Sequence, residues 1–368
     1  MTATITAIVE PPGGGISLPS SDELGLLARV CETLAEDVVG WVALGARILA
    51  DPDLVASGAL SPLTFAEAEK AVVEATIGPR GLSQARWALA AVAEGVRLFN
   101  AAFPEVDRAV ASRLAGVASL LYGGETGVDV RPVGAGSVSD VPATLPELMT
   151  ELASVNAEPD GTIEIQTLTA ADGSRRHVVY LPGTDDMATL PGHRDADLRD
   201  MDENVRLIAG QHTAYEVGVL DALAGAGVKP DEPVLLAGHS QGGMVAVAVA
   251  TAAAGLGYRV TNVVTVGAPA PTAPPRGTTV LALENEGDIV PLTDGALATA
   301  TPQKVTVEFA SGSTGITDAH SLRHYIEGAE AVEESSDPRL RGVAGEVDAF
   351  LDVPDATVTA RTYVLTRH

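Results

Sequence analysis

The chain has 368 residues, which is enough for about two structural units of ordinary size, and its single cysteine, Cys31, allows no intrachain disulfide. Apolar residues make up 46% of the chain, so a buried core is expected rather than disorder. The 23 Lys and Arg residues face 49 Asp and Glu residues, and a net charge of −26 repels nucleic-acid phosphates and anionic lipid surfaces, so nucleic acid is not expected as a partner.

Neither a signal peptide nor a transmembrane segment is expected. Residues 1–15 lack a basic segment followed by a continuous apolar stretch. The most apolar run, Met244–Ala254, is shorter than the roughly 18 residues that span a bilayer. The sequence therefore predicts a cytoplasmic protein by default, with leaderless export as the alternative.

Helical periodicity dominates residues 1–122. Ser20–Glu23 and Thr64–Glu67 both have the pattern of a capping box, with Ser or Thr followed three residues later by Glu. Apolar residues at spacings of three and four follow each box, as expected for helices with one buried face. We expect four helices in this all-α region, covering about residues 24–48, 64–77, 87–99 and 104–117.

A connector is expected over residues 123–160. Gly123 and Gly124 open it, and Gly, Pro and Ser recur between Val128 and Pro146. These residue types have low propensity for helix and strand. We therefore expect the boundary between the helical region and a second domain, residues 161–368, to lie here.

The pattern changes beyond residue 160. Thr162–Thr169 alternates like a strand, and Asp172-Gly173 supplies a hairpin turn. Short apolar strands then alternate with helices, which is typical of an α/β fold with a mostly parallel sheet covered by helices on both faces. We expect strands at His177–Leu181, Val234–Ala237, Val260–Val266, Thr279–Leu283 and Lys304–Phe309, and helices at Arg199–Ala224 and Gly242–Ala254.

One motif in this α/β domain points to chemistry. Gly238–Gly242 reads GHSQG, the pattern G-x-S-x-G, between an apolar strand and an apolar helix. That context is the one in which a sharp turn holds a nucleophilic serine at the top of a sheet. Ser240 is therefore the candidate nucleophile. His239 is expected to be structural.

A serine hydroxyl is a weak nucleophile, so the hypothesis requires an acid and a histidine further along the chain. Asp288 follows the strand expected at Thr279–Leu283, at the edge of the sheet where α/β proteins bind ligands. Glu284, Glu286 and Asp294 remain alternatives for the acid. His320 is favoured as the base because it lies where a loop meets a helix, and His324 remains its alternative.

Acyl transfer also requires donors for the oxyanion. The backbone N–H of Gln241, directly after the serine, is one candidate. Thr184 is the other, because it follows an expected strand and the adjacent Gly183 allows close backbone approach. No organic cofactor is expected, since the glycines at 13–15 and 134–136 lack the following helix and lysine of nucleotide-binding loops. No metal is expected, since His320 and His324 lack a third ligand at a recognisable spacing.

Five segments in order resemble the α/β-hydrolase superfamily, and within it the class 3 lipase-like branch. These segments, within residues 177–325, are YLPGTDD, GHSQGG, VTVGAPAP, ENEGDIVP and DAHSLRHY. The resemblance implies an α/β-hydrolase-type sheet, with Ser240, Asp288 and His320 as the triad and Thr184 and Gln241 as the oxyanion hole. The N-terminal helices are not part of that family's core, and no lid rich in aromatic residues is evident.

The expected activity is hydrolysis of carboxylic or lipid esters, with a small-molecule or lipid ester as the partner. An acyltransferase or thioesterase with the same triad is one alternative, and an inert hydrolase-like interaction protein is another. The N-terminal helices bear some resemblance to the helical hairpins of actinobacterial leaderless secreted proteins. A protein partner or export machinery is therefore a further possible ligand of that region, and the oligomeric state is left open.

Overall fold

The computed structural model describes residues 3–9, 21–58, 61–77, 82, 86, 127–137, 142–185, 196–269, 277–292 and 303–368. The chain divides into two compact units. Met1–Gly15 and Ala109–His368 form the larger unit, and Ile16–Arg108 form the smaller one.

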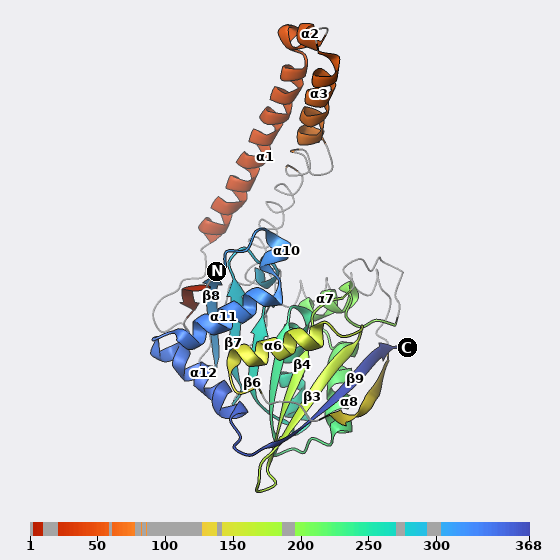
Figure 1. The fold of residues 1–368 in the computed structure, drawn as a ribbon, viewed down its shortest axis with the longest axis vertical. Coiled ribbons are helices and arrows are strands. Elements are labelled where there is room, and N and C mark those ends of the chain that lie inside the picture. Colours follow the sequence, from red (N-terminus) through yellow and green to blue (C-terminus); the bar gives the residue numbers. More distant parts are fainter. Residues whose placement is uncertain are drawn as a thin grey trace. The chain divides into compact units, whose positions relative to one another are not determined.

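A single sheet is the centre of the larger unit (Figure 1). Nine strands of the described residues form it, in the order β1-β8-β7-β6-β5-β4-β3-β9-β2. Strands β4 to β8 run parallel in the middle, and the other strands join antiparallel at the two edges. The strands are β1 (Thr4–Val9), β2 (Val128–Ser137), β3 (Thr162–Thr169), β4 (Arg175–Leu181), β5 (Pro233–His239), β6 (Arg259–Val266), β7 (Thr279–Asn285), β8 (Lys304–Ala310) and β9 (Thr357–Arg367).

Helices cover both faces of this sheet, so its central strands are apolar on both sides. Leu235 of β5 belongs to one core together with α6, α11 and α12, whereas Leu236 belongs to the other core together with α8 and α9 (Figure 1). The expected α/β class with a largely parallel, helix-covered sheet is confirmed. The helices are α6 (Leu145–Asn156), α7 (Met201–Ile208), α8 (Ala214–Ala226), α9 (Gln241–Gly255), α10 (Ile316–Ala319), α11 (Leu322–Glu334) and α12 (Pro338–Leu351), with a 3-10 turn, η1 (Val290–Leu292).

The single long helix expected over Arg199–Ala224 is wrong, because the chain forms α7 and α8 there. Gly210 has a φ of 67°, a left-handed conformation that ends the first helix. Thr213 then caps the second helix, its side chain accepting a hydrogen bond from the N–H of Glu216. The sequence carries local signals of this break, since the polar run Gly210–Thr213 interrupts the apolar positions and Thr213–Glu216 has the capping-box pattern, and the sequence reasoning missed them.

The expected connector, residues 123–160, contains ordered elements. Strand β2 pairs antiparallel with β9, and α6 packs on the sheet. Pro132 lies in β2, which is an edge strand of the sheet that the described residues form, and edge strands tolerate proline because one side of their backbone is not needed for pairing. Long-range pairing thus overrides the low local propensity of the segment. The domain boundaries themselves stay a prediction.

The N-terminal region is not all-α, since Thr4–Val9 forms β1 beside β8. The smaller unit contains α1 (Ser21–Leu49), α2 (Pro52–Gly58) and α3 (Pro62–Ile77) (Figure 1). Gly45 allows α1 and α3 to approach closely, because a Cβ there would lie 2.6 Å from Cγ2 of Thr76. The helices expected over residues 87–99 and 104–117 lie outside the described residues.

Candidate active site

Ser240 lies at the sharp turn between β5 and α9. Its backbone has φ 53° and ψ −122°, a strained conformation for a residue with a side chain. The flanking glycines make the turn possible. A Cβ on Gly238 would lie 2.2 Å from the carbonyl oxygen of Gly242, and one on Gly242 would lie 2.0 Å from that of Leu181. The G-x-S-x-G pattern therefore fits a turn in which strand and helix backbones touch and the serine stands at the carboxyl end of the strand.

The structure brings Ser240, His320 and Asp288 together. Nε2 of His320 lies 2.9 Å from Oγ of Ser240. Nδ1 of the same ring lies 2.7 Å from Oδ2 of Asp288. The Asp288 side chain is fully buried and that of His320 is 23% exposed, so the ring bridges a buried carboxylate and a more accessible hydroxyl. This is the geometry of a nucleophile, a base and an acid that orients the base.

Asp288 is held by two further hydrogen bonds. The N–H of Val290 donates to its Oδ1 over 2.9 Å, and the hydroxyl of Tyr325 donates to its Oδ2 over 2.5 Å. Burial alone would raise the pKa of Asp288. The hydrogen bonds from His320 and Tyr325 and the charge on His320 outweigh burial and hold that pKa below its ordinary value. The carboxylate is thus kept ionised.

The alternatives to this set lie elsewhere or outside the described residues. His324 is buried in the first turn of α11, four residues after His320, with Nε2 3.3 Å from Oδ2 of Asp318 and Nδ1 3.4 Å from Oε2 of Glu327. Both ring nitrogens of His320 are already bonded to Ser240 and Asp288, so Glu284 and Glu286 are not its partners. Asp294 lies outside the described residues.

The two expected oxyanion donors lie on either side of the serine turn. A Cβ on Gly183 would lie 3.0 Å from Cβ of Ser240, so the loop carrying Thr184 packs against Ser240. Asn204 donates to the Thr184 hydroxyl oxygen over 2.9 Å. Gln241 begins α9, and the first N–H groups of a helix have no partner within it.

Side-chain hydrogen bonds hold both the loop with Gly183 and the start of α9 in place. Asn156 accepts a hydrogen bond from the N–H of Gly183 over 3.0 Å. The Gln241 side chain donates to the carbonyl oxygen of Asp200 over 2.8 Å. Sequence reasoning missed Asn156 and Asp200, because nothing local distinguishes them from ordinary helix-end residues.

A buried ionic network lies next to Gln241. Arg367 of β9 donates to Asp200 over 2.8 Å and to Glu203 over 3.2 Å. The Arg367 side chain is 2% exposed and that of Asp200 is fully buried. Removing one member of such a network leaves the others as uncompensated buried charges. The network therefore holds in place Asp200, whose carbonyl oxygen accepts the hydrogen bond from the Gln241 side chain.

His239 is a buried neighbour of His320. Its ring centroid lies 4.7 Å from that of His320. Burial, and then the charge of His320, lower the pKa of His239 to about 3, so it is neutral at ordinary pH. Its Nδ1 is buried without a hydrogen-bond partner among the described residues.

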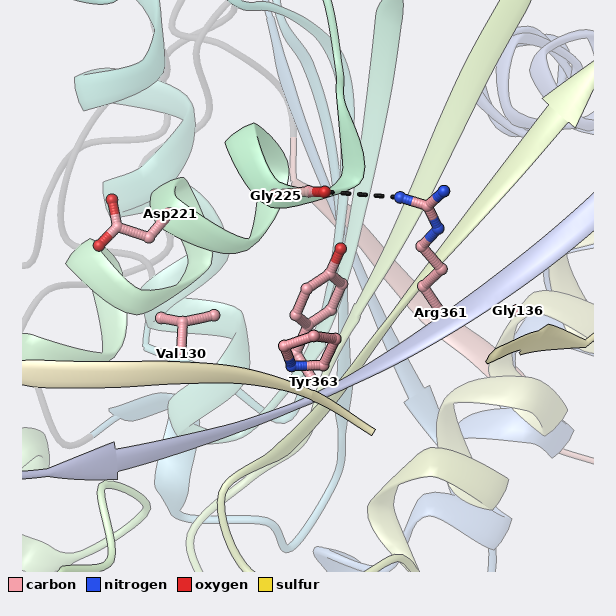
Figure 2. A pocket seen from close by; sticks show the side chains of 7 residues that line it. Val130, Gly136, Asp221, Gly225, Arg361 and Tyr363 are labelled. Atoms are coloured by element: carbon pink, nitrogen blue, oxygen red, sulfur yellow. Dashed lines mark hydrogen bonds between the residues drawn. The ribbon is translucent and has the colours of Figure 1, made fainter. Parts of the chain in front are cut away.

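Three further observations bear on ligands. Within the described ranges, no group of three or more His, Cys, Asp or Glu side chains is placed to hold a metal ion, and no helix is long and apolar enough to cross a membrane. A cavity of about 580 Å³ lies between α8 and the β2–β9 edge of the sheet, and its lining includes Asp221, Arg361 and Tyr363 (Figure 2). It contains none of the three triad candidates, so it is not part of this site.

Comparison with known proteins gives one family match. Residues 212–321 match the thioesterase domain family, and this segment contains all three triad candidates. In the comparison with curated proteins, nothing matches the chain.

Among solved structures, similarity is low. The esterase EstE5 in a crystal soaked with ethyl alcohol is 15% identical, with 64% of this chain and 98% of that chain covered and a TM-score of 0.28. The Lip2 lipase from Yarrowia lipolytica is 14% identical, with 58% and 78% covered and a TM-score of 0.24. An esterase/lipase from an uncultured bacterium is 14% identical, with 64% and 98% covered and a TM-score of 0.25. On the family match, the chain is similar over residues 212–321 to thioesterase domains.

Proposed function

We propose that this protein is a serine hydrolase that cleaves carboxylic or lipid esters through a covalent acyl-enzyme. The observation that carries the proposal is the continuous series of hydrogen bonds from Ser240 through His320 to Asp288, at 2.9 Å and 2.7 Å. The strained serine turn supports it because such a turn exposes a nucleophilic serine at the end of a strand. The ionised, buried acid supports it because a serine hydroxyl needs a base that is held in place by a third group.

Each residue has a distinct role in this proposal. Oγ of Ser240 attacks the ester carbonyl while Nε2 of His320 takes the hydroxyl proton. Asp288 holds the imidazole in the tautomer with Nδ1 protonated and stabilises the imidazolium. The N–H groups of Gln241 and Thr184 donate to the oxyanion of the tetrahedral intermediate. His320 then returns the proton to the leaving alcohol, and a water molecule activated by the same base releases the acid and free Ser240.

Thioester hydrolysis by the same residues is the second candidate. The match of residues 212–321 to the thioesterase domain family favours it. The two activities share the attack and the acyl-enzyme and differ only in the leaving group, an alcohol or a thiol. Transfer of the acyl group to an alcohol in place of water is a variant of the same chemistry.

A fluorophosphonate probe tests whether the site is reactive. The probe should modify Ser240, located by mass spectrometry, and a Ser240→Ala variant should lose that modification. An unmodified Ser240 in folded protein would contradict the proposal and favour the inert, interaction-only alternative.

Matched oxygen esters and thioesters of graded chain length then identify the substrate class. Consistently higher kcat/KM for the oxygen esters supports esterase activity, and the reverse supports the thioesterase candidate. Added alcohol that diverts product from acid to ester would identify acyl transfer.

A further inference from the structure

Tyr325 reaches the acid of the candidate triad from the helix that follows the base. Its hydroxyl lies 2.5 Å from Oδ2 of Asp288. Nδ1 of His320 lies 2.7 Å from the same oxygen. One carboxylate oxygen therefore accepts hydrogen bonds from two donors, and only one of them is the base.

The position of Tyr325 is fixed on several sides. The side chain is fully buried, and its ring packs edge-on against Phe309 of β8 with centroids 5.6 Å apart. Gly267, with a φ of 60°, packs against the hydroxyl end. A Cβ on Gly267 would lie 3.0 Å from the Tyr325 hydroxyl oxygen and 3.1 Å from Oδ2 of Asp288. The phenol therefore cannot turn away from the carboxylate without moving the backbone around it.

The hydroxyl is a permanent donor. Burial, followed by the charge of Asp288, raises the pKa of Tyr325 far above its ordinary value, so the phenol keeps its proton throughout the working pH range. A hydrogen bond to a charged acceptor withdraws part of the charge that the acceptor offers to other donors. Tyr325 therefore competes with His320 for the negative charge on Oδ2.

We propose that Tyr325 is a positioning residue of the active site that acts through Asp288. Its hydrogen bond orients Oδ2 of Asp288 toward His320 and also limits how strongly Oδ2 stabilises the imidazolium form of His320. This inference rests on the proposed hydrolase function. Among the residues that the structure describes, His239 from β5 and Glu284 from β7 are further titratable groups that face the Asp288–His320 pair or the phenol. His239 is neutral at ordinary pH, so protonation of His239 does not compete with the effect of Tyr325 there.

Two changes at this position should act in opposite directions. Tyr325→Phe removes the competing donor, so His320 should bind its proton more tightly, and the acid limb of the kcat/KM profile should move to higher pH by about half a unit to one unit. Replacing Tyr325 with 3,5-difluorotyrosine makes a stronger donor of almost the same size, so that limb should move to lower pH. In Tyr325→Phe, kcat should fall about tenfold with KM little changed, because Asp288 orients His320 less well while the contacts to the substrate are kept.

Tyr363→Phe is the matched control. Tyr363 is a buried tyrosine of β9 that lines the remote cavity in Figure 2. Removing its hydroxyl group should leave the pH profile of kcat/KM unchanged. A general structural effect would lower activity without moving the acid limb. If Tyr325→Phe does not fold, the difluorotyrosine protein still shows whether the acid limb moves in the expected direction, to lower pH.

The ionisation of His320 can also be followed by NMR titration of its ring, independently of turnover. Opposite shifts in the Phe and difluorotyrosine proteins support the inference. An unmoved ionisation in both, or a shift of the same sign in both, overturns it. The proposed function fails separately, if Ser240→Ala keeps its activity, and the NMR titration still decides the role of Tyr325 in that case.

Discussion

Nε2 of His239 donates a hydrogen bond to the backbone carbonyl oxygen of His320 over 3.1 Å, so the residue before Ser240 holds the chain that carries His320. Because the carbonyl can only accept, the proton of the neutral ring is on Nε2. The two histidines are 81 residues apart in sequence. This contact ties the turn after β5 to the start of α11.

The buried His239 predicts a dependence of stability on pH. Its pKa is lowered from 6.5 to about 3 in the folded chain, so between those values the unfolded chain binds more protons. The free energy of unfolding should therefore fall as pH falls through this window, with His239 contributing about 1.4 kcal/mol per pH unit.

Denaturant unfolding between pH 4 and pH 7 measures this effect. His239→Gln, which lacks the titrating ring, should show a flatter slope than wild type. His368→Gln is the control, because the His368 side chain is 62% exposed and lies 3.7 Å from the exposed carboxylate of Asp129, and it should keep the wild-type slope. Equal slopes for all three proteins would show that His239 is not buried in its neutral form.

The glycines of the turn after β5 predict a second result. Gly242→Ala would place a Cβ 2.0 Å from the carbonyl oxygen of Leu181. Relieving this clash requires a shift of the backbone of α9 or of β4, which costs free energy. The variant should lose at least a hundredfold in kcat/KM, or several kcal/mol of stability, as expected when a strained active-site turn is distorted. Kinetics and thermal unfolding of the purified variant measure both.

Gly255→Ala is the matched control in the same helix. Nothing lies within 4 Å of a Cβ at Gly255, the last residue of α9. Alanine there should leave activity unchanged and add up to about 1 kcal/mol of stability. A harmless Gly242→Ala would contradict the close approach of α9 to the end of β4.

Sequence reasoning predicted the elements whose signals are local. The strand, turn and helix around Ser240 follow from the apolar segments on either side of a glycine-flanked serine. The place of Asp288 followed from its position after β7, because neighbouring parallel strands end at the same edge of the sheet. The catalytic roles of these residues stay predictions.

Other features could not be predicted because they depend on contacts distant in sequence. Strands β1, β2 and β9 exist through pairing at the sheet edges, which overrides their weak local patterns. Tyr325 and Asp288 are 37 residues apart, and a buried tyrosine that bonds a carboxylate has the same helical spacing as one that only packs. The break between α7 and α8, by contrast, has a local signal that the sequence reasoning missed, namely Gly210 followed by the capping box Thr213–Glu216.

The buried ionic network predicts a third result. Arg367→Met leaves Asp200 and Glu203 without their common cation, which should cost about 3–5 kcal/mol of stability. Urea unfolding measures this loss. Arg361→Met on the same strand is the control, since Arg361 is exposed and its hydrogen bonds to described residues are long, at 3.3 Å and 3.4 Å, to carbonyl oxygens at the end of α8 (Figure 2). The control should cost no more than about 1 kcal/mol, and equal losses in the two variants would contradict the network.

The most direct test of the account is the turnover number of Ser240→Ala on a short p-nitrophenyl ester. Ser174→Ala, in the turn between β3 and β4, serves as the control for a serine outside the site. We predict that Ser240→Ala lowers turnover by a factor on the order of 10⁴–10⁶, as in other serine triads, while Ser174→Ala matches wild type. A Ser240→Ala protein that keeps most of the wild-type turnover would contradict the assignment of Ser240 as the nucleophile, and with it the proposed hydrolase function.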